Sequence, residues 1–149
     1  MKMNNMESTK SIAEIQDEIV EEFEMLGDDI QEKQWHIINI GEDNPGLPAE
    51  QQTDENRIYG CQSLVWVVPT KENEKLSFKG DSNSPFVKGL VTLVTRIFSG
   101  HKPDEIINAK IEFLDRIGLE AHTSFFRRNG MEALVKKIKE IALSVNSNQ

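Results

Sequence analysis

The chain has 149 residues, of which 38% are hydrophobic and 28% charged, a balance typical of one soluble globular domain with a sizeable core. Its net charge is −8, and its acidic residues are concentrated in the first part: residues 1–55 carry 15 acidic and 3 basic side chains, whereas residues 56–149 carry 10 and 14. An acidic chain that lacks a basic stripe interleaved with aromatic residues is a poor candidate for binding nucleic acid.

Membrane and secretory classes are also disfavoured. No apolar run approaches the ~20 residues that a membrane-spanning helix needs, and the segment MKMNNMESTK has no apolar core of a signal peptide. The single cysteine cannot form an internal disulfide, which fits a reducing, cytoplasmic location and excludes a four-cysteine zinc site. We interpret the acidic half as a solvated helix face, with a surface that steers a basic partner as the alternative.

Residues 1–10 are expected to form a flexible tail, and residues 11–149 a single domain. From Ser11 the apolar residues repeat at three- and four-residue spacing, which predicts a helix that ends at Gly27. Ser11 and Glu14 have the spacing of a capping box at its start.

A second helix is predicted over IQEKQWHIINIG, residues 30–41, with Gly41 as its stop. Its expected buried face consists of Ile30, Trp35, Ile38 and Ile40. Residues 42–56 hold two prolines and a glycine among polar side chains and therefore predict a loop.

Strands are predicted for the middle of the chain. Strand character begins near Arg57, and SLVWVVPT, residues 63–70, is rich in β-branched and aromatic residues, with Trp66 expected in the core and Pro69 at the end of the run. After a polar turn, residues 75–82 alternate apolar and polar side chains. Together these segments predict a small antiparallel meander.

The rest of the chain returns to helix. Ser84 as N-cap and Pro85 at the first helical position predict a helix that ends at Gly100. Residues 102–118 predict one or two short helices, and a last helix is expected from Asn129 to about Ser144. Helices, then strands, then helices indicate an α+β domain, with a small antiparallel sheet of three strands covered by helices from both chain ends.

The sequence motifs that several common kinds of catalytic site require are absent. There is no Walker A loop, no G-x-G-x-x-G and no G-x-S-x-G, and the three histidines do not pair at helical spacing as in a zinc protease. The remaining candidate is Cys61, in RIYGCQSLVWVVP, residues 57–69. A lone cysteine is most often a small buried apolar residue. Against this, Cys61 lies at a loop-to-strand junction after Gly60, which leaves room for a partner to approach, and Arg57 is the nearest cation in sequence for a thiolate.

Four motifs in order give the chain a resemblance to the SufE family of sulfur acceptors, over roughly residues 12–143. They are GCQSLVWV (60–67), matching the family's G-C-x-S-x-V-W; KGDSNSPFVKGLVTLV (79–94); IINIG with the proline-bearing loop after it; and RRNGMEAL (127–134), matching R-x-N-G before a helix. The resemblance implies a SufE/NifU-like α+β fold.

The resemblance also implies a function. Cys61 would accept persulfide sulfur from a SufS-type cysteine desulfurase, activate that enzyme and pass the sulfur to a SufBCD-type scaffold for iron–sulfur cluster assembly. Gly60, Gln62 and Ser63 would shape the cysteine loop, and Asp81 and Arg127 would lie near that loop and the partner surface. No metal or cofactor is expected on this chain, since pyridoxal phosphate belongs to the desulfurase, and the chain is expected to be a monomer or weak homodimer.

Three rival functions are weighed against this one. A cluster scaffold of the IscU/NifU type needs several cysteines to hold iron, and the chain has one. A one-cysteine thiol peroxidase would bring a thioredoxin-like βαβ pattern, which the chain lacks. A pure interaction module with an inert cysteine stays open. Because a sulfur carrier reacts once per sulfur, whether it counts as an enzyme is a matter of definition.

Overall fold

The computed structural model describes residues 10–60, 63–119 and 130–147. The helix α2, Ile12–Glu24, begins as predicted: the Glu14 amide donates to Ser11 Oγ over 3.0 Å, and the Ser11 amide donates to Glu14 Oε1 over 2.8 Å. This pair of bonds satisfies two of the amides that a helix start leaves open.

The helix α3, Ile30–Glu42, corrects two predictions. Trp35 was expected to be buried, but its side chain is 62% exposed, because the face turned to the core repeats at four-residue spacing through Lys33, Ile37 and Gly41. Gly41 does not stop the helix either, since α3 continues to Glu42.

Gly41 instead lets α3 cross the next long helix, α4, Pro85–Phe98, at very short range. A Cβ atom on Gly41 would lie 2.8 Å from the backbone nitrogen of Gly89, and one on Gly89 would lie 1.9 Å from the carbonyl oxygen of Ile37. Both glycines are therefore required by the contact between the two backbones.

The sheet has two strands rather than the predicted three. The strands β1, Val65–Glu72, and β2, Lys75–Ser82, pair antiparallel from Val65↔Ser82 to Glu72↔Lys75. The segment before β1 pairs with it through the isolated bridge Arg57↔Trp66 and forms no third strand. β1 also runs past Pro69, whose missing N–H faces the open edge of the sheet, where no ladder bond is needed.

The other helices follow the sequence closely. Ser84 caps α4, with Pro85 at its first position, and the predicted short helices are α5, Pro103–Ile107, and α6, Phe113–Arg116. A single 3-10 turn, η1, Ala49–Gln51, lies in the predicted loop. The helix α7, Glu132–Ser147, ends three residues later than expected, and its predicted start at Asn129 lies outside the described residues.

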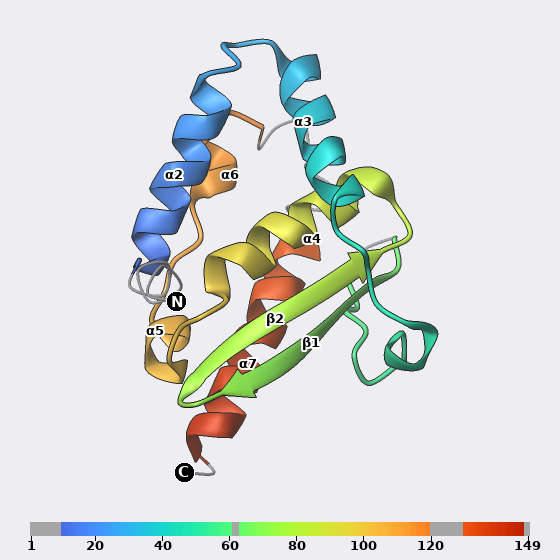
Figure 1. Ribbon diagram of the computed structural model, residues 1–149, viewed down its shortest axis with the longest axis vertical. Helices are drawn as coiled ribbons and strands as arrows, with labels where there is room; N and C mark the ends of the chain where they lie inside the picture. Colours follow the sequence, from blue (N-terminus) through green and yellow to red (C-terminus); the bar gives the residue numbers. More distant parts are fainter. Residues whose placement is uncertain (1–9, 61–62, 120–129, 148–149) are drawn as a thin grey trace, which may run out of the picture.

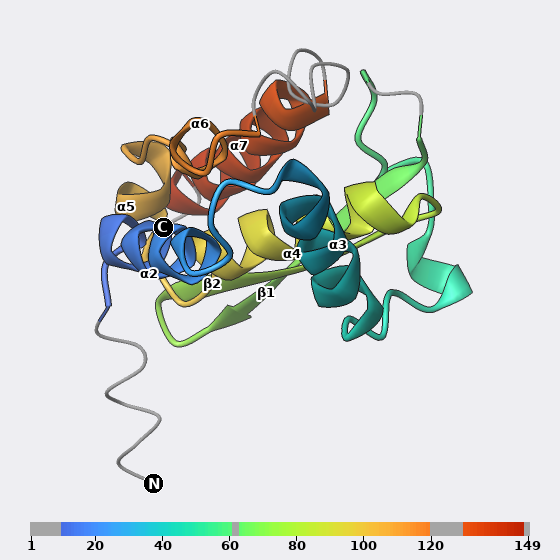
Figure 2. The ribbon, with the colours of Figure 1, turned by 90° about the horizontal axis from the view of Figure 1, so that it is seen from above.

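The helices are stacked on one face of the sheet. α4 lies directly on the sheet, with α2 and α3 beside it, and α7 lies on the same side, next to α5 (Figure 1, Figure 2). The main core lies between these layers and includes Phe23, Ile37, Phe98 and Phe113. The α+β architecture with helices from both chain ends is thus confirmed.

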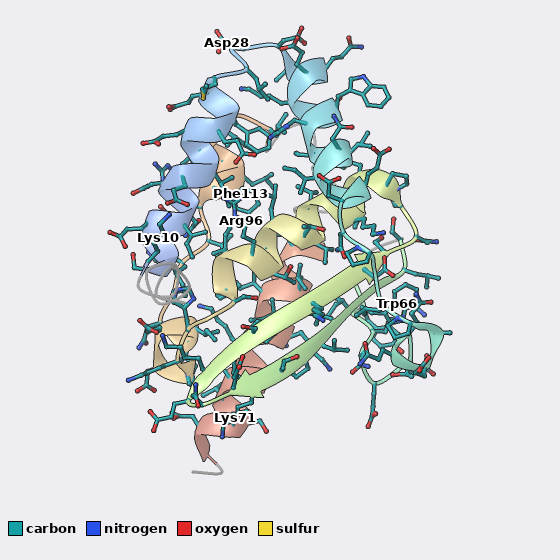
Figure 3. The ribbon with its side chains drawn as sticks, viewed as in Figure 1. Lys10, Asp28, Trp66, Lys71, Arg96 and Phe113 are labelled. Atoms are coloured by element: carbon teal, nitrogen blue, oxygen red, sulfur yellow. The ribbon has the colours of Figure 1, made fainter. Side chains whose placement is uncertain are left out.

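A second, smaller cluster lies on the opposite face of the sheet. Trp66, predicted to be core, is buried there with Leu47 and Val68 rather than among the helices. The segment 44–52 covers this end of the sheet, near the Trp66 side chain labelled in Figure 3. The cluster therefore fixes the segment 44–52 beside the N-terminal end of β1.

Candidate functional site

In the sequence Cys61 stands between two segments that pair with each other, and we call residues 56–67 the cysteine hairpin. Its arms are joined by two backbone hydrogen bonds: the Ile58 amide donates to the Val65 carbonyl over 2.7 Å, and the Val67 amide donates to the Asn56 carbonyl over 2.9 Å. Gly60 has a backbone φ of 112°, a conformation that side-chain-bearing residues rarely adopt. Cys61 and Gln62 themselves lie outside the described residues.

Asn83 holds the returning arm of the hairpin. Its side-chain oxygen accepts a hydrogen bond from the Leu64 amide over 2.9 Å, and its own amide donates to the Leu64 carbonyl over 3.2 Å. Asn83 stands between the end of β2 and the cap of α4, so it connects the cysteine hairpin to both elements. Sequence reasoning missed this residue, although it lies within the quoted motif at residues 79–94.

Asp81 was a predicted site residue, and the structure places it inside β2, opposite Trp66, with 8% of the residue exposed. Its carboxylate accepts hydrogen bonds from the Leu47 amide over 2.9 Å, the Gln52 side chain over 3.2 Å and the Ser82 amide over 2.8 Å. The Lys88 Nζ lies 3.7 Å from the Asp81 Oδ1. These contacts place the carboxylate where it supports the segment 44–52, beneath the surface.

Glycine is required where that segment meets Asp81. Gly46 has a φ of 80°, and a Cβ atom on it would lie 2.6 Å from the Asp81 Oδ2. The segment then reaches the cysteine hairpin through Asn56, whose side-chain nitrogen donates to the Gln51 carbonyl over 2.9 Å. Hydrogen bonds thus join Asp81 to residues 47 and 52, and residue 51 to the first arm of the hairpin.

The surface beside the hairpin carries several cations. The Arg57 guanidinium carbon lies 4.8 Å from the centre of the Tyr59 ring, and the Lys137 Nζ on α7 donates to the Glu55 carbonyl over 3.0 Å. A cavity of about 320 Å³ opens here between the hairpin and α7, with Arg57, Tyr59, Lys136 and Lys137 among its lining residues. Figure 2 shows the described part of the hairpin rising on the same side of the sheet as α7.

The structure brings some predicted site residues together and leaves others untested. Gly60 and the half-buried Ser63 flank the undescribed pair in the cysteine hairpin, and Asp81 supports its base from the neighbouring strand. Arg127 lies outside the described residues. No three histidine, cysteine, aspartate or glutamate side chains within the described ranges gather as metal ligands would. No described helix has the length and apolar character to cross a membrane.

Comparison with known proteins shows which family the chain is similar to. A family model described as SufE: Fe-S metabolism associated domain matches residues 17–142. An uncharacterized SufE-like protein of Rhizobium meliloti is 36% identical over 133 residues, which is 85% of this chain and 93% of that protein. Another from Rhizobium etli is 37% identical over 131 residues, covering 85% and 88% of the two chains.

A solved structure shares the fold. The solution structure of a hypothetical protein from Thermus thermophilus matches with a TM-score of 0.70, over 89% of this chain and 96% of that one, at 19% sequence identity. At this identity the match concerns the fold alone.

Proposed function

The chain belongs to the SufE family of iron–sulfur metabolism, and from this premise we propose that it is the sulfur acceptor and activator of a SufS-type cysteine desulfurase, with Cys61 as the acceptor. The sulfur then passes to a SufBCD-type scaffold for cluster assembly. The single observation that supports the proposal is the place of the only cysteine in the sequence, between two arms of a hairpin that are held by Asn83 and by the segment that Asp81 supports.

The transfer is a thiol–persulfide exchange. The Cys61 thiolate attacks the terminal sulfur of the persulfide on the desulfurase cysteine, a bond forms between the two sulfurs, and the bond inside the original persulfide breaks. The desulfurase cysteine leaves as a thiolate and Cys61 becomes the persulfide, so the sulfur changes carrier without net oxidation. The proton that each sulfur carries exchanges with solvent.

This reaction asks for two properties of the carrier, and the fold suits both. The acceptor sulfur has to reach into the active site of another protein, which favours a hairpin connection over a position inside a helix or ladder. The arms next to the cysteine have to keep a defined direction, which is what the bonds at Ile58, Leu64 and Val67 provide.

The remaining parts of the reaction belong to the partners. Pyridoxal phosphate, on the desulfurase, releases sulfur from cysteine, and the scaffold supplies the iron site. The single cysteine supports a reducing compartment such as the cytoplasm as the place of action. Because each chain carries one sulfur per cycle, it acts as a stoichiometric carrier.

The proposal is tested by incubating the purified chain with its desulfurase and cysteine and measuring its intact mass without reductant. We expect the chain to gain the mass of one or more sulfur atoms, and Cys61→Ser to gain none. Desulfurase turnover should rise with the wild-type chain and stay at its basal rate with the variant. Treatment with a reductant should return the wild-type mass to its starting value.

An interaction module with an inert cysteine predicts the opposite pattern. Wild type and Cys61→Ser would then keep the same mass and change desulfurase turnover equally. Such a result would remove Cys61 from the mechanism and refute the acceptor function.

A further inference from the structure

Arg57 and Tyr59 form a pair on the first arm of the cysteine hairpin, directly before its connection. The guanidinium lies over the aromatic ring at 4.8 Å, within the range of a cation–π contact, and Tyr59 is 57% exposed. Among the buried side-chain nitrogen and oxygen atoms of the described residues, Arg57 Nε is the one with no hydrogen-bond partner. That nitrogen is itself buried, but the terminal N–H groups of a guanidinium donate to a carboxylate in a planar fork, so the half-buried Arg57 favours an acidic ligand.

The residues around the pair make the preference for an acidic ligand a property of a larger surface. The cavity of about 320 Å³ beside Arg57 is also lined by two lysines of α7, Lys136 and Lys137, and by two acidic residues, Asp54 and Glu140. Lys136 is exposed to solvent. With three cations against two anions, this surface differs in sign from residues 1–55, which hold 15 acidic and 3 basic side chains.

We propose that Arg57, Tyr59 and Lys136 form a docking surface, here called the Arg–Tyr surface, for an acidic segment of the desulfurase. A carboxylate of that segment binds the Arg57 guanidinium, and the Tyr59 ring packs against the side chain next to that carboxylate in the segment. Lys136 attracts the segment from the edge of the cavity. The inference rests on the proposed function and adds to it the chemistry by which the partner is recognised.

Two physical arguments support an anchor of this kind. Arginine and tyrosine are enriched among the few interface residues that carry most of the binding energy, and they bring a flat, rigid contact at low entropic cost. The acidic half of the chain repels an acidic segment while the Arg–Tyr surface attracts it, so the field of the molecule steers the encounter toward the hairpin that holds Cys61.

The test compares the affinity of the desulfurase holoenzyme for four full-length variants at several salt concentrations. Arg57→Gln removes the fork and the charge, Arg57→Lys removes the fork alone, and Lys136→Glu reverses a rim charge. Lys71→Glu is the matched control, since Lys71 is also exposed but lies at the far end of the β1–β2 hairpin (Figure 3).

The expected results follow from these changes. Arg57→Gln raises the dissociation constant about tenfold and Arg57→Lys by less, because the lysine keeps the charge. Lys136→Glu raises it roughly three- to tenfold and makes binding less dependent on salt, whereas Lys71→Glu binds as the wild type does. The backbone bonds of the hairpin do not involve the Arg57 side chain, and thermal unfolding verifies that each variant is folded.

The failures are distinguishable. If the wild-type chain is loaded with sulfur but Arg57→Gln and Lys136→Glu bind as tightly as Lys71→Glu, the Arg–Tyr surface is refuted and the acceptor function stands. If Arg57→Gln is unfolded, Lys136→Glu alone decides, since an exposed helix residue leaves the fold intact. If the wild-type chain neither binds the desulfurase nor gains sulfur, the proposed function fails and the docking surface fails with it.

Discussion

β1 takes part in two hairpins that are held together in different ways. Along its whole length it pairs with β2 in an unbroken register from Val65↔Ser82 to Glu72↔Lys75, around a turn in which Asn73 has a φ of 61°. At its N-terminal end the cysteine hairpin has one described bridge, Arg57↔Trp66, with the backbone bonds at Ile58 and Val67, and the side chains of Asn83 and Asn56 add further hydrogen bonds.

The difference teaches how one strand serves two purposes. A long ladder of backbone bonds opens only when much of the domain unfolds, whereas an arm held by a few backbone and side-chain bonds opens locally at a lower free energy. We therefore expect the β1–β2 hairpin to be the rigid base and the described arms of the cysteine hairpin to open at the lower free energy. Three substitutions test this contrast.

The largest effect is expected for Asp81→Asn. The substitution places an amide N–H₂ group where a carboxylate oxygen accepts from the Leu47, Gln52 or Ser82 donors, so at least one buried donor is left without an acceptor. We expect a loss of about 2 kcal/mol in the free energy of unfolding, measured by urea denaturation. Exchange of the Leu47 and Val67 amides should accelerate at the same time.

Asp28→Asn is the matched control for that experiment. Asp28 is exposed between α2 and α3, at the top of Figure 3 and well away from Trp66. Its substitution should change the free energy of unfolding by less than about 0.5 kcal/mol. An equal loss for both variants would show that Asp81 has no special supporting role.

A smaller and more local effect is expected for Asn83→Ala. It removes the acceptor of the Leu64 amide but leaves the backbone bond from residue 83 to the Leu64 carbonyl. The hairpin should open more easily by about 1 kcal/mol, seen as roughly fivefold faster exchange of the Ile58 amide.

The reference site for that measurement lies at the other end of the sheet. The Leu76 amide, which donates to the His101 carbonyl over 2.8 Å, should exchange at an unchanged rate in Asn83→Ala. Equal acceleration at both amides would mean that the two hairpins open together, and the contrast between them would be lost.

The smallest effect is expected for Asn73→Gly. Glycine adopts a positive φ as readily as asparagine or more so, so the turn keeps its geometry and unfolding should change by less than about 0.5 kcal/mol. Ile58 exchange should remain at the wild-type rate. A change there would show that the turn and the cysteine hairpin are coupled along β1.

Much of the fold could be predicted from local sequence signals. The capping box at Ser11, the Ser84–Pro85 start of α4 and the alternation over residues 75–82 each depend on near neighbours, and each was confirmed. The exposed Trp35 and the continuation of α3 through Gly41 were missed, because both depend on how α3 crosses α4. The prediction of a third strand was wrong. The segment before β1 makes one isolated bridge to it, and how far two segments pair depends on the path of the whole chain, which local sequence does not encode.

The candidate site could be predicted only in part. Cys61 and Gly60 stand out by composition and motif, and Asp81 was selected from the family resemblance. The links through which Asp81 supports the hairpin, by way of Leu47, Gln52 and Asn56, join residues that are far apart in the chain. No local pattern marks such contacts, so the structure was needed to find them.

The most direct test of the central claim is a single-turnover transfer. A desulfurase loaded with one persulfide and freed of cysteine is mixed with the chain, and the intact masses of both proteins are followed over time. The account predicts that the desulfurase loses one sulfur as the wild-type chain gains one, in equal amounts, and that Cys61→Ser leaves the desulfurase loaded. A desulfurase that keeps its sulfur with the wild-type chain, or loses it only as free sulfide, would contradict the assignment of Cys61 as the acceptor.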